Sequence, residues 1–140
     1  MILLDTDHLT VLRLGKGERF TRLMVRLATA AEPLATTIVN VEEQMRGWLA
    51  AIAKERTPER QVQAYRELRA LFGRFAAFEI APFDDPAAVR FKDIRTGRGH
   101  IGTRDLKIAA ITLVNDALLL TANRRDFEQV PGLRFENWLD

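Results

Sequence analysis

The sequence predicts an α/β fold, a three-layer α/β/α sandwich around a central, mostly parallel sheet of four to five strands. Short apolar stretches alternate with helix-like patterns along the chain, and this alternation is typical of parallel sheets. Several of these stretches are apolar throughout, as strands buried on both faces are. The 140 residues contain no repeat, linker or change of composition, so we expect one domain over residues 1–140.

The first quarter of the chain predicts a strand, two helices and a second strand. "MILL" (1–4) is a short apolar strand bounded by polar residues, and the helix after it ends at Gly15, a residue suited to a helix C-terminus. Apolar residues at helical spacing predict a helix over 19–31, which Pro33 stops. "LATTIV" (34–39) is rich in β-branched residues and predicts the second strand.

The middle of the chain predicts helices followed by a third strand. From Val41 onward, apolar residues recur on one face of a helix. Thr57 as N-cap, Pro58 in the first position and Glu59 in the first turn mark the start of another helix. "FEIAPF" (78–83) is the third strand.

The last part predicts helices over 84–95 and 103–116, a fourth strand over 117–122 and a fifth over 133–138. Ligands of such folds bind at the carboxyl ends of the strands. Polar residues that follow a strand directly are therefore the first candidates for a functional site.

Composition restricts the chemistry and the compartment. The chain has no cysteine, which excludes disulfides, thiolate zinc sites and cysteine nucleophiles and suits a reducing compartment. Lys and Arg number 21 against 19 Asp and Glu, so the net charge says little. No apolar run approaches the roughly 20 residues that cross a bilayer, and Asp5 comes too early for a signal peptide. We expect a soluble, cytoplasmic protein without membrane contact.

Four acids follow strands or begin helices at what should be one end of the sheet. Asp5 follows the first strand, and Asp126 lies just past the fourth. Asp105 lies in the first turn of the helix before the fourth strand, and Glu43 in the first turn after the second. Each alone is also explained by helix capping, worth about 0.3–1 kcal/mol, or by a turn. Glu42 flanks the apolar stripe of its helix and rivals Glu43.

Together, the acids predict a metal site. Crowded carboxylates stay ionised only beside a positive charge, and oxygen ligands suit Mg²⁺ or Mn²⁺ rather than zinc. Such an ion can activate water and neutralise the leaving oxygen of a phosphodiester. The basic segment 95–104 runs into Asp105, and arginine around an acidic metal pocket suits a nuclease. The candidate RNA contacts are Arg46, Arg98, Arg104, Arg124 and Arg125.

Four segments resemble the PIN domain, and more closely the VapC-type toxins of bacterial toxin–antitoxin pairs: "LLDTDHL", "TTIVNVEEQMRG", "IGTRDLKIAAITLVNDALLLTANRRDFEQVPGL" and "ENW". The resemblance implies a Mg²⁺-dependent ribonuclease with a cluster of four acids. It makes Asp5 and Asp105 the principal metal ligands. Glu43, with Gly47 four residues later, matches the family glutamate, and Asp126 completes the set directly or through water.

The resemblance also implies supporting residues and partners. Thr121 and Asn123 resemble polar residues that orient the carboxylates, and the family implies a homodimer and a cognate antitoxin whose tail occupies the active-site groove. The chain has "EEQ" where many members have "AEL", which leaves Glu42 open as a substitute for Glu43. For the large aromatic side chains we expect core packing: Trp48, Phe72, Phe75 and Phe78.

Three other functions remain open from the residues. "DTDHLT" could be the D-x-D motif of a haloacid-dehalogenase-type phosphatase with Asp5 as nucleophile, although that family has glycine where this chain has His8. A metal-free ribonuclease could use His8 and His100 as acid and base. A non-catalytic module that binds RNA or an antitoxin could share the same fold.

Overall fold

A five-stranded parallel sheet forms the centre of the molecule. The computed structural model describes residues 1–96 and 100–140. Within them the strands are β1 (Ile2–Leu4), β2 (Ala35–Thr37), β3 (Glu79–Ala81), β4 (Leu118–Leu120) and β5 (Arg134–Glu136). They lie in the order β3-β2-β1-β4-β5, and each neighbouring pair is parallel. The predicted α/β fold is confirmed.

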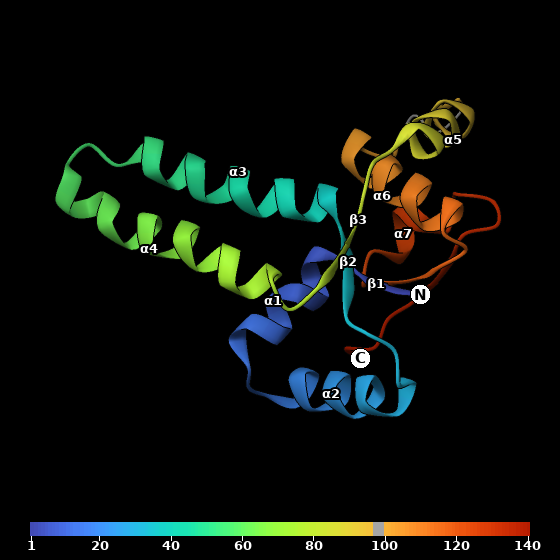
Figure 1. Cartoon of the computed structure of the whole chain (residues 1–140), viewed down its shortest axis with the longest axis horizontal. Helices are drawn as coiled ribbons and strands as arrows, with labels where there is room; N and C mark the ends of the chain where they lie inside the picture. Colours follow the sequence, from blue (N-terminus) through green and yellow to red (C-terminus); the bar gives the residue numbers. More distant parts are fainter. Residues whose placement is uncertain (97–99) are drawn as a thin grey trace.

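Helices cover both faces of this sheet. The described part of the chain forms α1 (Thr6–Leu14), α2 (Glu18–Ala30), α3 (Ile38–Lys54), α4 (Pro58–Phe75), α5 (Asp85–Arg95), α6 (Thr103–Val114) and α7 (Arg124–Phe127). Helices α1 and α2 lie on one side and α5 and α6 on the other (Figure 1), while α3 and α4 form a hairpin that extends away from the sheet. Among these helices, none is long and apolar enough to span a membrane.

The central strands contribute side chains to two apolar clusters, one on each face of the sheet. In β1, Leu3 joins the cluster under α5 and α6, whereas Leu4 joins the one under α1 and α2. In β4, Leu119 and Leu120 divide in the same way. Successive side chains of a strand point to opposite faces, so a strand between two helical layers must be apolar throughout. Each fully buried leucine contributes roughly 1.5–3 kcal/mol.

The helix boundaries follow the predicted local signals. Gly15 ends α1 with φ 66°, a backbone conformation that glycine adopts without strain, and its N–H donates to the Val11 carbonyl. The Thr57 side chain accepts from the Arg60 N–H at the start of α4. These contacts satisfy backbone groups that a helix end otherwise leaves unpaired.

Two predictions about the elements are wrong. The second strand ends at Thr37, and Ile38 and Val39 begin α3 instead, because the Thr37 hydroxyl accepts from the Asn40 N–H and caps the helix. Glu43 consequently lies in the second turn of α3, not the first. The short helix α7 was not predicted; the Asn123 side chain caps it by accepting from the N–H of its third residue.

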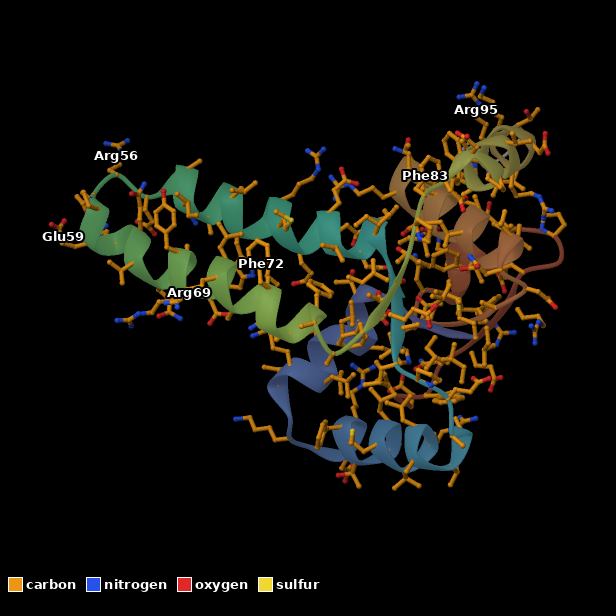
Figure 2. All side chains as sticks on the ribbon, viewed as in Figure 1. Arg56, Glu59, Arg69, Phe72, Phe83 and Arg95 are labelled. Carbon is orange, nitrogen blue, oxygen red and sulfur yellow. The ribbon has the colours of Figure 1, made fainter. Side chains whose placement is uncertain are left out.

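The expected core packing of the aromatic side chains is only partly right. Phe75 and Phe78 pack against the cluster under α1 and α2. Phe72 on α4 (Figure 2), in contrast, is 67% exposed and lines an open hollow together with Val41 and Met45 of α3, so the prediction is wrong for this residue. Trp48 on α3 is half-buried.

Candidate active site at the carboxyl edge of the sheet

The structure brings the four predicted acids to one edge of the sheet. Asp5 follows β1, Asp126 lies in α7 beyond β4, and Asp105 lies in the first turn of α6. The pKa of Asp105 is raised from 3.8 to about 6, first by burial and then by three neighbouring carboxylates. Those carboxylates belong to Asp5, Glu43 and Asp126. Residues from four separate elements therefore share one electrostatic environment.

Asp5 is buried and held from three directions. Its Oδ1 accepts from the Thr6 N–H at 2.8 Å and from the Asn40 Nδ2 at 2.8 Å. Its Oδ2 accepts from the Thr121 hydroxyl at 2.8 Å. Burial and then the charge of Asp7 raise the pKa of Asp5, and the hydrogen bonds offset only part of that shift. The sequence left two explanations for Asp5, a helix cap or a member of the acid cluster. In the structure its side chain is both.

Glu43 is connected to Asp5 through two polar side chains. The Thr6 hydroxyl donates to the Glu43 Oε2 at 2.9 Å, and the Asn40 Nδ2 donates to the Thr6 hydroxyl at 3.1 Å. Burial raises the pKa of Glu43. Glu42, the rival candidate, instead forms an ion pair of 2.8 Å with Arg46. The structure thus places Glu43 in the cluster and turns Glu42 toward a cation on its own helix.

Asp105 and Asp126 are joined by one amide group. The Asn123 Nδ2 donates to the Asp105 Oδ2 at 3.3 Å and to the Asp126 Oδ2 at 3.1 Å. The Asn123 Oδ1 accepts from the Asp126 N–H. A single asparagine thus caps α7 and holds two carboxylates that would otherwise repel each other.

The donor chemistry of this cluster fits a hard divalent cation. The candidate ligands are carboxylate oxygens, which Mg²⁺ and Mn²⁺ prefer. In residues 1–96 and 100–140, no three Asp, Glu or His side chains stand close enough together to hold an ion by themselves. The cluster fits an ion that keeps several waters, as Mg²⁺ held by few carboxylates does.

Asp7 and His8 form a separate buried connection. The His8 Nε2 accepts from the Trp138 N–H at 3.2 Å, so its Nδ1 carries the proton and donates to the Asp7 Oδ1 at 2.6 Å. Burial raises the pKa of Asp7, but hydrogen bonds from His8 and the Ala122 N–H outweigh it, and the pKa lies below its ordinary value. Because both nitrogens of the fully buried His8 are engaged, its proposed role in a metal-free ribonuclease is wrong.

The candidate RNA-binding arginines differ in their surroundings. Arg104 lies beside Glu43, whose pKa its positive charge lowers in part. Arg46 forms an ion pair with Glu42 on its own helix, and Arg124 forms one with Glu128 at the end of α7. Arg125 is exposed. Arg98 lies outside the described residues.

Sequence reasoning missed two residues that connect the acids, Thr6 and Asn40. Asn40 is fully buried and lies three residues before Glu43. Residues three apart share a helix face, so the spacing could have revealed it. Thr6 directly follows Asp5 but gives no signal of its own, because threonine at this place also suits an ordinary first turn.

A comparison with known proteins finds a family whose model matches most of the chain. A family model described as the PIN domain matches residues 2–133. The tRNA(fMet)-specific endonuclease VapC of Salmonella typhimurium is 30% identical over 84 residues, which span 57% of this chain and 64% of that relative, less than two thirds of its length.

Solved structures share the fold. A chain of the DNA-bound VapBC from Salmonella typhimurium has a TM-score of 0.74 and 24% identity, covering 98% of this chain and 97% of its own. A chain of VapBC-1 from nontypeable Haemophilus influenzae has a TM-score of 0.79 and 18% identity, covering 100% of both. At sequence identities below 25%, this structural similarity shows only that the helices and strands are arranged in the same way.

Proposed function

The chain belongs to the PIN-domain family, and on that premise we propose that it is a divalent-metal-dependent endoribonuclease. The observation that supports the proposal is a continuous hydrogen-bonded network at the sheet edge. Asn40 and Thr6 connect Asp5 to Glu43, Asn123 connects Asp105 to Asp126, and Thr121 joins the two pairs by bonding to Asp5 and to the Asn123 N–H. The hydrogen-bond partners of these carboxylates are mainly amides and hydroxyls. Such neutral donors orient a carboxylate without cancelling its charge, which leaves that charge for a cation.

The carboxylates that would hold Mg²⁺, or Mn²⁺, are Asp5 and Asp105 with Glu43 and Asp126, some of them through water that the ion keeps. A bound ion of this kind lowers the pKa of its water and neutralises the leaving oxygen of a phosphodiester. The residues around it hold the ligands in place: Thr121 fixes Asp5, and Asn123 fixes the Asp105 and Asp126 pair. Orienting contacts of this sort raise metal affinity and activity.

The basic side chains near the cluster would hold the RNA. Arg104 lines the same hollow as Glu43, and Arg125 is exposed on α7 beside the acids. Neutralising backbone phosphates gives binding that weakens as salt rises. Arg46 and Arg124 would contribute less, because each already pairs with an acid.

We further propose that the chain is the toxin of a toxin–antitoxin pair, works as a homodimer of one-domain subunits in the cytoplasm, and binds a cognate antitoxin. The VapC relative and the VapBC complexes support this assignment. Because that relative is named as specific for tRNA(fMet), initiator transfer RNA is the first substrate to test.

The test compares two adjacent glutamates. With Mg²⁺, the wild-type protein should cut RNA, while excess EDTA, Asp105→Asn and Glu43→Gln should each abolish cutting. Glu42→Gln is the matched control: it removes the neighbouring carboxylate from the same helix and should keep a rate close to wild type. Circular dichroism checks that each variant is folded.

Two outcomes would contradict the proposal. Cleavage that persists in EDTA or in Asp105→Asn would exclude a metal held by these acids. RNA binding by the wild-type protein without any new RNA ends would instead identify a non-catalytic binding module.

A further inference from the structure

The hollow that Arg104 and Glu43 line beside the acid cluster has so far been given no ligand of its own. Its volume is about 410 Å³, within the roughly 300–1,000 Å³ of typical ligand pockets. It is lined by Thr6, Glu43, Gln44, Gly47, Trp48 and Arg104. Two of these residues, Thr6 and Glu43, belong to the hydrogen-bonded network of the cluster. The hollow therefore opens directly onto the candidate catalytic centre.

We infer that this hollow is the subsite for one unpaired RNA base, stacked on the indole ring of Trp48; the inference rests on the proposed ribonuclease function. Trp48 is half-buried and lines the hollow, so the residue is partly enclosed by packing and partly accessible from the hollow. Every base has a π-face that can stack on an aromatic ring, and such stacking is a main source of affinity for single strands.

The spacing of residues along α3 gives this subsite its shape. Glu43 and Gly47, like Gln44 and Trp48, are four residues apart and lie on successive turns of one helix face. Trp48 follows Glu43 by five residues, about 7.5 Å along the helix axis at 1.5 Å per residue. A base that stacks there belongs to a nucleotide close to the bond that is cut.

The other lining residues suit a nucleotide. The space next to Gly47 is open, since a Cβ at this position would meet no atom of a residue beyond its chain neighbours within 4 Å. Gln44 offers an amide with both donors and an acceptor to a base edge. Arg104 supplies a positive charge for the adjoining phosphate.

A polypeptide fits a different part of the surface better. A second hollow, of about 340 Å³ between α1, α2 and α4, is lined mostly by apolar side chains such as Leu12, Phe20, Met24 and Phe75. Apolar anchors of a protein partner would be buried there. The Trp48 hollow combines one aromatic ring with an amide, a guanidinium group and a carboxylate, which is the chemistry of a nucleotide subsite.

The first test is kinetic. Trp48→Ala should raise the KM for single-stranded RNA about tenfold, the loss expected for one stacked base, with a smaller change in kcat. Trp48→Phe keeps an aromatic ring and should restore most of the wild-type KM. The matched control is Tyr65→Ala, which removes an aromatic ring that is 55% exposed on α4 and outside the hollow; its KM should equal that of wild type.

The second test uses fluorescence. The chain has two tryptophans, and Trp138 is buried with Arg26 over its ring. Hexa-adenylate RNA, added with Mg²⁺ to the Asp105→Asn protein so that it is not cut, should quench the emission of Trp48. A fully paired RNA duplex that is long enough to stay paired in the assay should quench much less. Adding Trp48→Phe to that protein should remove the quenching.

Several outcomes overturn the inference without touching the proposed function. They are a wild-type KM in Trp48→Ala, or the absence of quenching by the single strand. An unchanged KM together with weaker binding of a protein partner would assign the hollow to that partner. Failure of the wild-type protein to cut any RNA would instead overturn the proposed function itself.

Discussion

Asp105 at the carboxyl edge of the sheet and Asp140 at the chain end are both partnered by an asparagine, but with opposite results. Asn123 donates to Asp105 at 3.3 Å, and burial together with other acids raises the pKa of that carboxyl to about 6. Asn137 donates to Asp140 at 2.9 Å, and Arg19 adds hydrogen bonds and a positive charge, so the pKa of Asp140 is lowered. The two carboxylates differ first in burial and then in the charges beside them: other acids surround Asp105, whereas Arg19 faces exposed Asp140.

This difference shows how the chain uses its charges. At the surface, acids are neutralised by arginines of the same chain and need no other ion. At the sheet edge, the acids retain uncompensated charge, which costs folding free energy. Sites kept at such a cost are typical of function, and the variants below test whether the cost and the function belong together.

Replacing Asn123 by alanine should have the largest effect, and the same replacement at Asn137 is its control. Asn123→Ala should lower RNA cleavage about 10–100-fold, as expected when a group that orients metal ligands is removed. Asn137→Ala removes the corresponding contact at Asp140 and should leave the cleavage rate unchanged. Cleavage rates at saturating Mg²⁺ and the Mg²⁺ concentration for half-maximal rate measure both effects. Equal losses in the two variants would contradict the distinction between the regions.

The stability of the metal-free protein should depend on Asp105. Its pKa of about 6 in the folded chain exceeds its ordinary value of 3.8. Between these values the folded chain keeps a proton that the unfolded chain releases, so this group makes stability fall as pH rises through that window. Asp105→Asn should therefore be more stable than wild type at about pH 8, by about 1 kcal/mol, less than the full ~3 kcal/mol because solvent reaches the side chain.

Urea unfolding in EDTA at about pH 3.5 and about pH 8 measures this difference. The gain in stability should appear at the higher pH and be nearly absent at the lower one, since Asp105 is then protonated in the folded chain and mostly protonated in the unfolded chain. Added Mg²⁺ should stabilise wild type more than the variant. If Asp105→Asn is less stable than wild type at the higher pH, a positive charge already balances the Asp105 carboxylate. The contrast drawn between Asp105 and Asp140 would then be wrong.

The smallest effect is expected at the surface ion pairs. Arg26 forms an ion pair of 3.2 Å with Glu136 and lies over the ring of Trp138. Arg26→Ala should lower the free energy of unfolding by less than about 1 kcal/mol, because solvent and salt screen both contacts. Cleavage should not change. If Arg26→Ala lost activity while a thermal melt showed that it was still folded, this surface region would contribute to the site.

The sequence predicted the fold well where the signal is local. The strands are recognisable because β1 and β4 lie between two helical layers and are apolar throughout. The starts of α4 and α5 are recognisable because Thr57 and Asp84 cap the residues just after them. The start of α3 was missed, since β-branched Ile38 and Val39 favour a strand and the cap at Thr37 prevails.

The site was predictable only as a set of candidates. The positions of Asp5, Asp105 and Asp126 relative to the strands indicate one sheet edge. The choice between Glu42 and Glu43 depends on which way each points from α3, and this is decided by Thr6 and Arg46. The exposure of Phe72 likewise depends on how the hairpin is packed.

The sequence by itself determined the alternation of helices and strands, the order of the acids along the chain and the absence of thiol chemistry. These features rest on interactions between residues a few positions apart. The tertiary structure alone decided that Thr121 would reach Asp5, 116 residues away, and that Trp48 would line a hollow beside Glu43. Such pairings depend on the packing of distant elements, and no local pattern encodes that packing.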